Sequence, residues 1–149
     1  MTAGCMTAGP ADAILVAEDE PLVALDLQTT LGKEGFEVVG PTGDLDEALT
    51  LAEATALDAA ILDINLGETM VFPAAEKLLA RRVPIVFVSG YEADTVLPER
   101  FRAVPALSKP LDHGELRRTL RAVLAPSSAA QRSGLGEGKR VVGGVGPSS

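Results

Sequence analysis

Short apolar runs alternate along this chain with stretches of helical spacing, and this alternation restricts the folds open to it. Apolar runs of four or five residues beside turn residues suit buried strands. The runs are "AILVA" (13–17), "FEVV" (36–39), "AAIL" (59–62), "IVFV" (85–88) and "VPAL" (104–107). Between them apolar residues recur at helical intervals, as at Leu116, Leu120 and Leu124. Strands that alternate with helices in this way predict a doubly wound α/β domain with a parallel sheet.

A proline indicates the place of the last strand in that sheet. Pro105 lies inside the run 104–107 and has no N–H to donate to a strand ladder, so its strand belongs at an edge. In the flavodoxin-like strand order 2-1-3-4-5 the fifth strand is an edge. We therefore predict a five-stranded parallel sheet in this order.

Proline and acidic residues mark where helices begin. Pro21 and Pro73 stand where a first helical turn accepts proline. Asp44 is placed to cap the second helix, with Glu47 as its capping-box partner. Pro98 interrupts the next stretch, for which we predict a short or irregular helix.

Length and composition indicate one globular domain with a segment on either side. The chain has 149 residues and is 46% hydrophobic, enough to bury a core. We place the domain at residues 12–125 and a flexible N-terminal segment at 1–11. Residues 126–149 are mostly Gly, Ser and Pro without an apolar period, so we expect a disordered tail there.

Charge and cysteine content restrict partners and location. A formal charge of −8 argues against nucleic acid, whose phosphates attract basic surfaces. No apolar stretch approaches the roughly 20 residues of a membrane span, and the N-terminus lacks the features of a secretion signal. The one cysteine, Cys5, suits a reducing cytosol. We expect a cytoplasmic protein with no membrane or nucleic-acid partner.

Polar side chains follow the ends of the predicted strands. Glu18 and Asp19 come after the first strand, Asp63 after the third, Ser89 after the fourth and Lys109 after the fifth. Because the carboxyl ends of parallel strands meet at one edge of a sheet, we expect these groups to face a single rim.

The chemistry of this set indicates a cation site and phosphoryl transfer. Glu18, Asp19 and Asp63 repel one another at close range unless a cation intervenes. Oxygen ligands at an open site suit Mg²⁺ better than Zn²⁺. Lys109 is a second cation, able to pair with a carboxylate or a phosphoryl oxygen. A metal and a lysine together neutralise charge during phosphoryl transfer to a carboxylate nucleophile.

Each of these residues also has a simpler explanation. The acids of 18–20 suit a helix N-terminus, and Asp63 alone suits a loop cap. Ser89 with the following glycine suits an ordinary turn. Lys109 is explained as a solvated residue leading into the last helix, with Asp112 as its N-cap.

Two other polar features call for no site. His113, the sole histidine, is expected to be exposed in the first turn of the last helix, where it is a poor candidate for a phosphohistidine donor. Arg81 and Arg82 follow the third predicted helix, whose dipole favours cations at that end.

Four motifs in order, "EDEP", "LDINL", "VSGY" and "LSKP", resemble the receiver domain of two-component response regulators across about residues 12–125. The resemblance implies a phosphoacceptor at Asp63 and Mg²⁺ as the cofactor. It also implies that Asp19 is a direct metal ligand and that Glu18 acts through water. The backbone carbonyl of Asn65 would complete the metal shell.

The resemblance gives roles to the remaining rim residues as well. Ser89 and Lys109 would bind the phosphoryl group, and the lysine would precede a cis-linked proline, Pro110. "PIVFVSGY" and "RFRAVPALSKP" look like the "FAT GUY" receivers, typically stand-alone regulators of alphaproteobacteria that work with atypical histidine kinases. Ala106 stands where most receivers carry Tyr or Phe, and Tyr91 is the substitute switch residue that this subgroup implies.

The expected function is therefore that of a single-domain response regulator. A histidine kinase or phosphotransfer protein would donate a phosphoryl group to Asp63, and the output would be protein–protein interaction or service as a phosphate sink. We expect no enzyme activity beyond self-phosphorylation and self-dephosphorylation.

Two alternatives stay open. One is a degenerate receiver that acts as a phosphorylation-independent scaffold. The other is a Mg²⁺-dependent aspartyl-phosphate hydrolase of the haloacid-dehalogenase kind. Such hydrolases carry Asp-x-Asp at the end of the first strand, whereas this chain has Glu-Asp-Glu at 18–20.

Overall fold

A parallel sheet with helices on both faces makes up the computed structural model, which describes residues 12–90 and 97–133. In chain order the elements are β1 (Ala13–Ala17), α2 (Pro21–Lys33), β2 (Glu37–Thr42), α3 (Leu45–Ala54), β3 (Ala59–Asp63), β4 (Asn65–Leu66), β5 (Thr69–Met70), α4 (Phe72–Ala80), β6 (Ile85–Ser89), the 3₁₀ helix η2 (Glu99–Phe101), β7 (Ala106–Ser108) and α5 (His113–Ser133). The α/β prediction is confirmed.

The strand order in the sheet is β2-β1-β3-β6-β7, and all of its strand pairs are parallel. Counted along the chain without the short strands β4 and β5, this is the predicted order 2-1-3-4-5. Strand β7 lies at the edge, and Pro105 immediately precedes it. The carboxyl ends of the strands therefore share one edge of the sheet.

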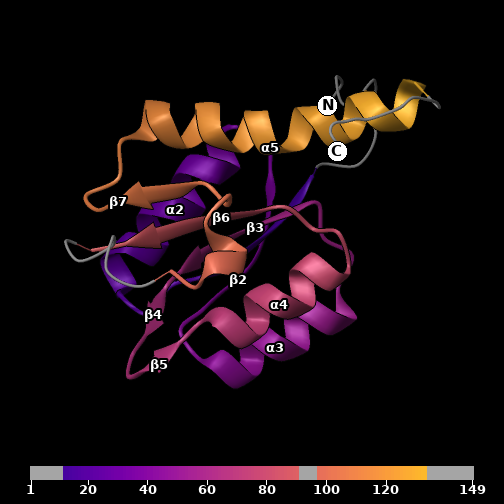
Figure 1. The fold of residues 1–149 in the computed structure, drawn as a ribbon. Coiled ribbons are helices and arrows are strands. Elements are labelled where there is room, and N and C mark those ends of the chain that lie inside the picture. The colour runs from indigo at the N-terminus through magenta and orange to yellow at the C-terminus, as the bar shows by residue number, and fades with distance from the viewer. Residues whose placement is uncertain (1–11, 91–96, 134–149) are drawn as a thin grey trace.

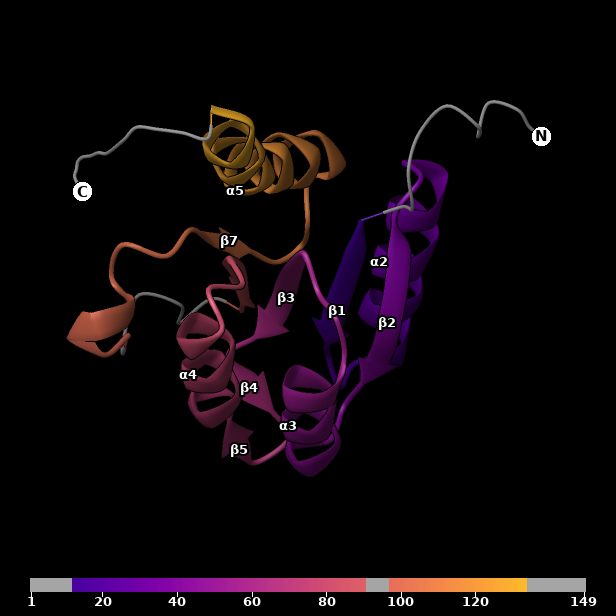
Figure 2. The same cartoon turned by 90° about the vertical axis from the view of Figure 1, so that its right-hand side faces the viewer.

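Two helices cover each face of the sheet. Figure 1 and Figure 2 show α2 and α5 on one side, and α3 and α4 on the other. Each side has its own apolar core: Leu27, Leu31, Leu116 and Leu120 pack on the first face, and Ala48, Ala52, Ala75 and Leu78 pack on the second. Between the two cores, every residue of strands β1, β3 and β6 is buried, as expected for strands covered on both faces.

The cap of α3 differs from the prediction in one partner. Asp44 caps the helix as predicted, because its Oδ2 accepts the Glu47 N–H at 2.9 Å. In a capping box the Glu47 carboxylate would accept the Asp44 N–H in return. Here the Thr42 hydroxyl takes that N–H at 3.1 Å and donates to Glu47 at 2.6 Å. The Thr42 hydroxyl therefore bridges the Asp44 N–H and the Glu47 carboxylate, which would bond each other directly in a capping box.

Two elements extend beyond what the sequence predicted. The hairpin of β4 and β5 (Asn65–Leu66 and Thr69–Met70) was not predicted, because two-residue strands leave no apolar period. Helix α5 continues to Ser133, whereas the tail was predicted from residue 126. Ala129 and Ala130 favour this continuation, since alanine is the best helix former.

Two helices have a proline in their first turn, as predicted, and the fourth helix is short. Pro21 and Pro73 lie in the first turns of α2 and α4. The fourth helix is represented by η2, and residues 91–96 lie outside the described residues, as do 1–11 and 134–149. None of the helices in the described part of the chain combines the length and hydropathy needed to span a bilayer.

Candidate functional site

The predicted polar residues come together at the carboxyl edge of the sheet. Asp63 is the last residue of β3, and Ser89 is the last residue of β6. Glu18 follows β1 directly, and Lys109 follows β7. The Lys109 N–H donates to the Ser89 carbonyl at 2.9 Å, which fixes the start of the β7–α5 loop beside β6. The register of the sheet thus brings residues from four strand ends to one rim.

The ammonium of Lys109 is the centre of this rim. Its Nζ donates to Oδ2 of Asp63 at 2.9 Å, to Oε1 of Glu20 at 2.9 Å and to Oε2 of Glu18 at 3.1 Å. The side chains of Glu18 and Asp63 are only 1% and 5% exposed. One cation therefore compensates two buried carboxylates and one exposed one.

Three acids form a second cluster that overlaps the first. One carboxylate oxygen from each of Glu18, Asp19 and Asp63 lies within 4.8 Å of the others. Burial raises the pKa of Glu18 to about 7, and the neighbouring Asp63 adds to the rise. Burial alone would lower the pKa of Lys109, but hydrogen bonds to Asp63 and Glu20 outweigh it and raise this pKa. The site holds more negative charge than one lysine neutralises.

Two buried oxygen atoms at this rim have no hydrogen-bond partner among the described residues. They are Oε1 of Glu18 and Oγ of Ser89. A buried polar atom without a partner costs about 1–3 kcal/mol, so such atoms at a rim of acids indicate a place where a ligand binds. The carboxylates of Glu18, Asp19 and Asp63 are hard oxygen donors, which fit Mg²⁺. The residues present therefore fit the cofactor that the motifs imply.

Backbone amides from a neighbouring hairpin hold two of the acids. The Asn65 N–H donates to Oδ1 of Asp63 at 3.1 Å, and the Gly67 N–H donates to Oδ2 of Asp19 at 2.9 Å. Neither Gly67 nor the role of Glu20 was predicted from the sequence. The role of Glu20 could have been predicted, because Glu20 belongs to the run of acids at 18–20. The Gly67 contact could not, because it depends on a hairpin whose short strands leave no pattern in the sequence.

The structure gives positions for Asn65, Pro110 and His113, whereas Tyr91 is not described. Asn65 is exposed at the start of β4, and the role of its carbonyl stays a prediction. The peptide bond between Lys109 and Pro110 is cis, the form that the resemblance implies. Tyr91 lies outside the described residues. His113 is the first residue of α5, and its Nε2 lies 3.0 Å from the Asp26 carboxylate.

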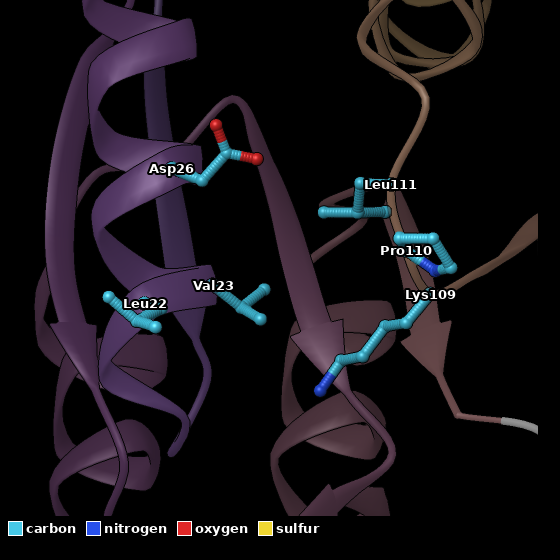
Figure 3. Close-up of a pocket in the computed structure, with 6 residues that line it drawn as sticks. All are labelled: Leu22, Val23, Asp26, Lys109, Pro110 and Leu111. Atoms are coloured by element: carbon cyan, nitrogen blue, oxygen red, sulfur yellow. The ribbon is translucent and has the colours of Figure 1, made fainter.

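A groove adjoins the rim on the side of α2. It is lined by Leu22, Val23, Asp26, Lys109, Pro110 and Leu111. Figure 3 shows Val23 and Asp26 of α2 pointing toward the three residues of the β7–α5 connection, whereas the side chain of Leu22 points away from them. Leu22 is 81% exposed, and Leu25 on the same helix is 58% exposed. Lys109 belongs both to the wall of the groove and to the acidic rim, so the two are continuous.

Comparison with solved structures gives the same fold. The chain is similar to SdrG from Sphingomonas melonis Fr1, with 39% identity, a TM-score of 0.70, and coverage of 78% of this chain and 99% of that one. It is also similar to a response regulator receiver protein from Sinorhizobium medicae, with 25% identity, a TM-score of 0.65, and coverage of 77% and 95%.

Comparison with known sequences identifies the family. Among curated proteins, the transcriptional regulatory protein PdtaR of Mycobacterium tuberculosis is 36% identical over 107 residues, covering 69% of this chain and 52% of PdtaR. The phyllosphere-induced regulator PhyR of Methylorubrum extorquens is 28% identical, covering 85% and 49%. The chain thus spans about half the length of these curated relatives. The family model of the response regulator receiver domain matches residues 14–121, and the chain belongs to that family.

Proposed function

We propose that this chain is a response regulator that accepts a phosphoryl group on Asp63 in a Mg²⁺-dependent reaction. One observation carries the proposal. Lys109 bonds both Asp63 and Glu18, while Oε1 of Glu18 and Oγ of Ser89 are buried at the same rim without a hydrogen-bond partner among residues 12–90 and 97–133. A phosphoryl group on Asp63 would bring acceptor oxygens to the Ser89 hydroxyl and the Lys109 ammonium.

The chemistry that we propose follows from the positions of these side chains. A carboxylate oxygen of Asp63 attacks the phosphorus of a phosphohistidine in a partner, and a new P–O bond forms as the P–N bond breaks. The electron pair of the broken bond stays on the imidazole nitrogen, which takes up a proton from solvent. Mg²⁺ held by Glu18, Asp19 and Asp63 would supply positive charge against the phosphoryl oxygens. Lys109 holds Asp63 in place beforehand.

The partner in this proposal is a histidine kinase or a phosphotransfer protein. Its phosphohistidine has to reach Asp63, and the groove adjoins this position at Lys109, which lines the groove and bonds Asp63. Leu22 in the groove wall and Leu25 elsewhere on α2 are exposed and offer apolar contacts to a partner. A formal charge of −8 disfavours nucleic acid as a direct partner, and we propose a cytoplasmic location.

The output that we propose is protein–protein interaction or service as a phosphate sink, as in the stand-alone "FAT GUY" receivers. Ala106 is exposed on β7 where most receivers carry an aromatic residue, which supports membership of that subgroup. The stand-alone role rests on the resemblance to that subgroup alone. The role of Tyr91 rests on the resemblance alone.

Mass spectrometry after incubation with a small phosphodonor tests the proposal. We expect the wild type to gain the mass of one phosphoryl group only when Mg²⁺ is present, and Asp63→Asn to gain none. Asp46→Asn, on the exposed surface of α3, is the matched control and should label like the wild type. Labelling that persists in Asp63→Asn would contradict the proposal, and steady turnover of a phosphate ester would favour a hydrolase instead.

A further inference from the structure

The hairpin of β4 and β5 contacts two of the three clustered acids through its backbone. The N–H of Asn65 in β4 donates to Asp63 at 3.1 Å, and the N–H of Gly67 in the turn donates to Asp19 at 2.9 Å. Asp63 and Asp19 follow different strands, β3 and β1. A single local element therefore holds carboxylates from two separate parts of the chain.

Core packing fixes this hairpin in place. Leu66 in β4 is 2% exposed and belongs to the core on the side of α3 and α4. Val71, just after β5, is fully buried, and its N–H donates to the Ile64 carbonyl at 2.8 Å. The Thr69 hydroxyl donates to the Leu66 carbonyl at 3.1 Å. Because both ends of the hairpin are anchored, the amide in its turn has a defined position beside the site.

The turn itself depends on glycine at one position. Gly67 has a φ of +60° and is the first of the two residues between β4 and β5, where a type II′ turn takes glycine. A Cβ added to Gly67 would meet nothing within 4 Å. An alanine at this position is therefore opposed by backbone conformation and not by a clash.

The hydrogen bond from Gly67 orients the Asp19 carboxylate at the site. The bond holds Oδ2 and leaves Oδ1, together with the second lone pair of Oδ2, available to a cation. On its other side, the backbone of Asp19 packs against Gly43, where a Cβ would lie 3.0 Å from the Asp19 Cα. A carboxylate that is already held in place loses less conformational freedom when a cation binds, and Mg²⁺ demands near-ideal geometry of its ligands.

We infer that the β4–β5 turn is a positioning element of the acidic site, and that the Gly67 N–H raises the affinity of the site for Mg²⁺ by holding Asp19. Gly67 is a positioning residue, since it acts through Asp19. The inference rests on the proposed cation site and adds the residue that orients one of its ligands.

Calorimetric titration of Mg²⁺ into the unphosphorylated protein tests this inference. We expect Gly67→Ala to weaken Mg²⁺ binding by about fivefold, the value of an ordinary hydrogen bond. Gly35→Ala is the matched control, because Gly35 also has a left-handed φ, of +91°, and open space around it. It strains the backbone far from the acids and should leave the affinity for Mg²⁺ unchanged.

The outcomes separate the two proposals. An unchanged Mg²⁺ affinity in Gly67→Ala would overturn the role of the turn, whereas a wild type that binds no Mg²⁺ would overturn the cation site itself. If Gly67→Ala does not fold, the chemical shift of the Gly67 amide proton in other, folded variants tests the inference instead. Asp19→Ala should shift the Gly67 amide proton upfield, and Asp46→Ala on exposed α3 should not. A Gly67 amide that is insensitive to Asp19→Ala would overturn the inference.

Discussion

The ammonium of Lys109 lies 3.1 Å from Oε2 of Glu18, a carboxylate whose side chain is 1% exposed. The same nitrogen lies 2.9 Å from Asp63, so two buried acids share one partially buried cation. Removing one partner of a buried ion pair leaves the other charge uncompensated, which is costly, whereas exposed pairs contribute little. The stability of the unphosphorylated state therefore depends on this lysine.

We predict that Lys109→Met lowers the free energy of unfolding by about 3 kcal/mol, because it leaves Glu18 and Asp63 without their cation. Urea denaturation measures the change. Lys77→Met is the matched control, since Lys77 pairs with Glu53 on the surface, with side chains 44% and 55% exposed. It should cost less than about 1 kcal/mol. Equal losses in the two variants would show that the Lys109 pairs contribute no more than a surface pair.

The raised pKa of Glu18 predicts a decline of stability with rising pH in the absence of divalent cations. The folded state holds the Glu18 proton up to about pH 7, against an ordinary value of 4.5. Between these values the folded state binds more protons than the unfolded state, so the contribution of Glu18 to stability is greatest below pH 4.5 and is lost as pH rises through 7. The change attributable to Glu18 is at most about 3 kcal/mol.

Urea denaturation between pH 5 and 8 in a chelating buffer, run on the wild type and on Glu18→Gln, isolates this effect. As pH rises, the unfolding free energy of Glu18→Gln should increase relative to that of the wild type, because the variant has no carboxylate at this position to ionise. Glu37→Gln, an exposed residue at the start of β2, serves as the control and should follow the wild type. Parallel curves for wild type and Glu18→Gln would contradict the assigned pKa.

The sheet and the rim were predictable because they follow from patterns that the sequence displays directly. Buried strands covered on both faces leave uninterrupted apolar runs, and the order of those strands determines which ends meet. Because Asp63 ends the third long strand and Lys109 follows the fifth, the topology brings both to the same edge of the sheet. Strand β6 lies between their strands, and the long side chain of Lys109 spans that distance to within 2.9 Å of Asp63.

Contacts that depend on side-chain direction across elements were not predictable. Arg81 was assigned to the dipole of its own helix, α4, but its guanidinium donates to the carbonyls of Ala52 and Thr55 at the end of α3. Long side chains reach elements that are distant in sequence, and nothing in the local pattern indicates which. The Gly67 bond to Asp19 belongs to the same class, since it joins residues 48 positions apart.

We predict that Mg²⁺ raises the melting temperature of the wild type, because it relieves the repulsion among Glu18, Asp19 and Asp63. At about 100 times the dissociation constant the gain is about 2.7 kcal/mol, equivalent to several degrees for a domain of this size. Differential scanning calorimetry measures it, and Asp19→Asn should show a smaller rise. A flat response in the wild type would favour a phosphorylation-independent scaffold.

Two buried hydroxyls offer a contrast between a polar atom with partners and one without. The Ser89 Oγ has no partner among the described residues, whereas the Thr42 hydroxyl donates to Glu47 at 2.6 Å and accepts from the Asp44 N–H at 3.1 Å. Both residues are nearly inaccessible to solvent, at 2% and 3% exposed. Burial therefore does not distinguish them, and hydrogen bonding does.

We predict that Ser89→Ala leaves the free energy of unfolding of the unphosphorylated protein unchanged or raises it by up to about 1 kcal/mol, because it removes an unsatisfied hydroxyl. Thr42→Val, which replaces a bonded hydroxyl by a methyl group, should lower that energy by about 1–3 kcal/mol. Urea denaturation of both variants in chelating buffer is the measurement. A loss in Ser89→Ala as large as that in Thr42→Val would show that the Ser89 hydroxyl is already satisfied before phosphorylation. Its proposed role as a donor held ready for the phosphoryl group would then be wrong.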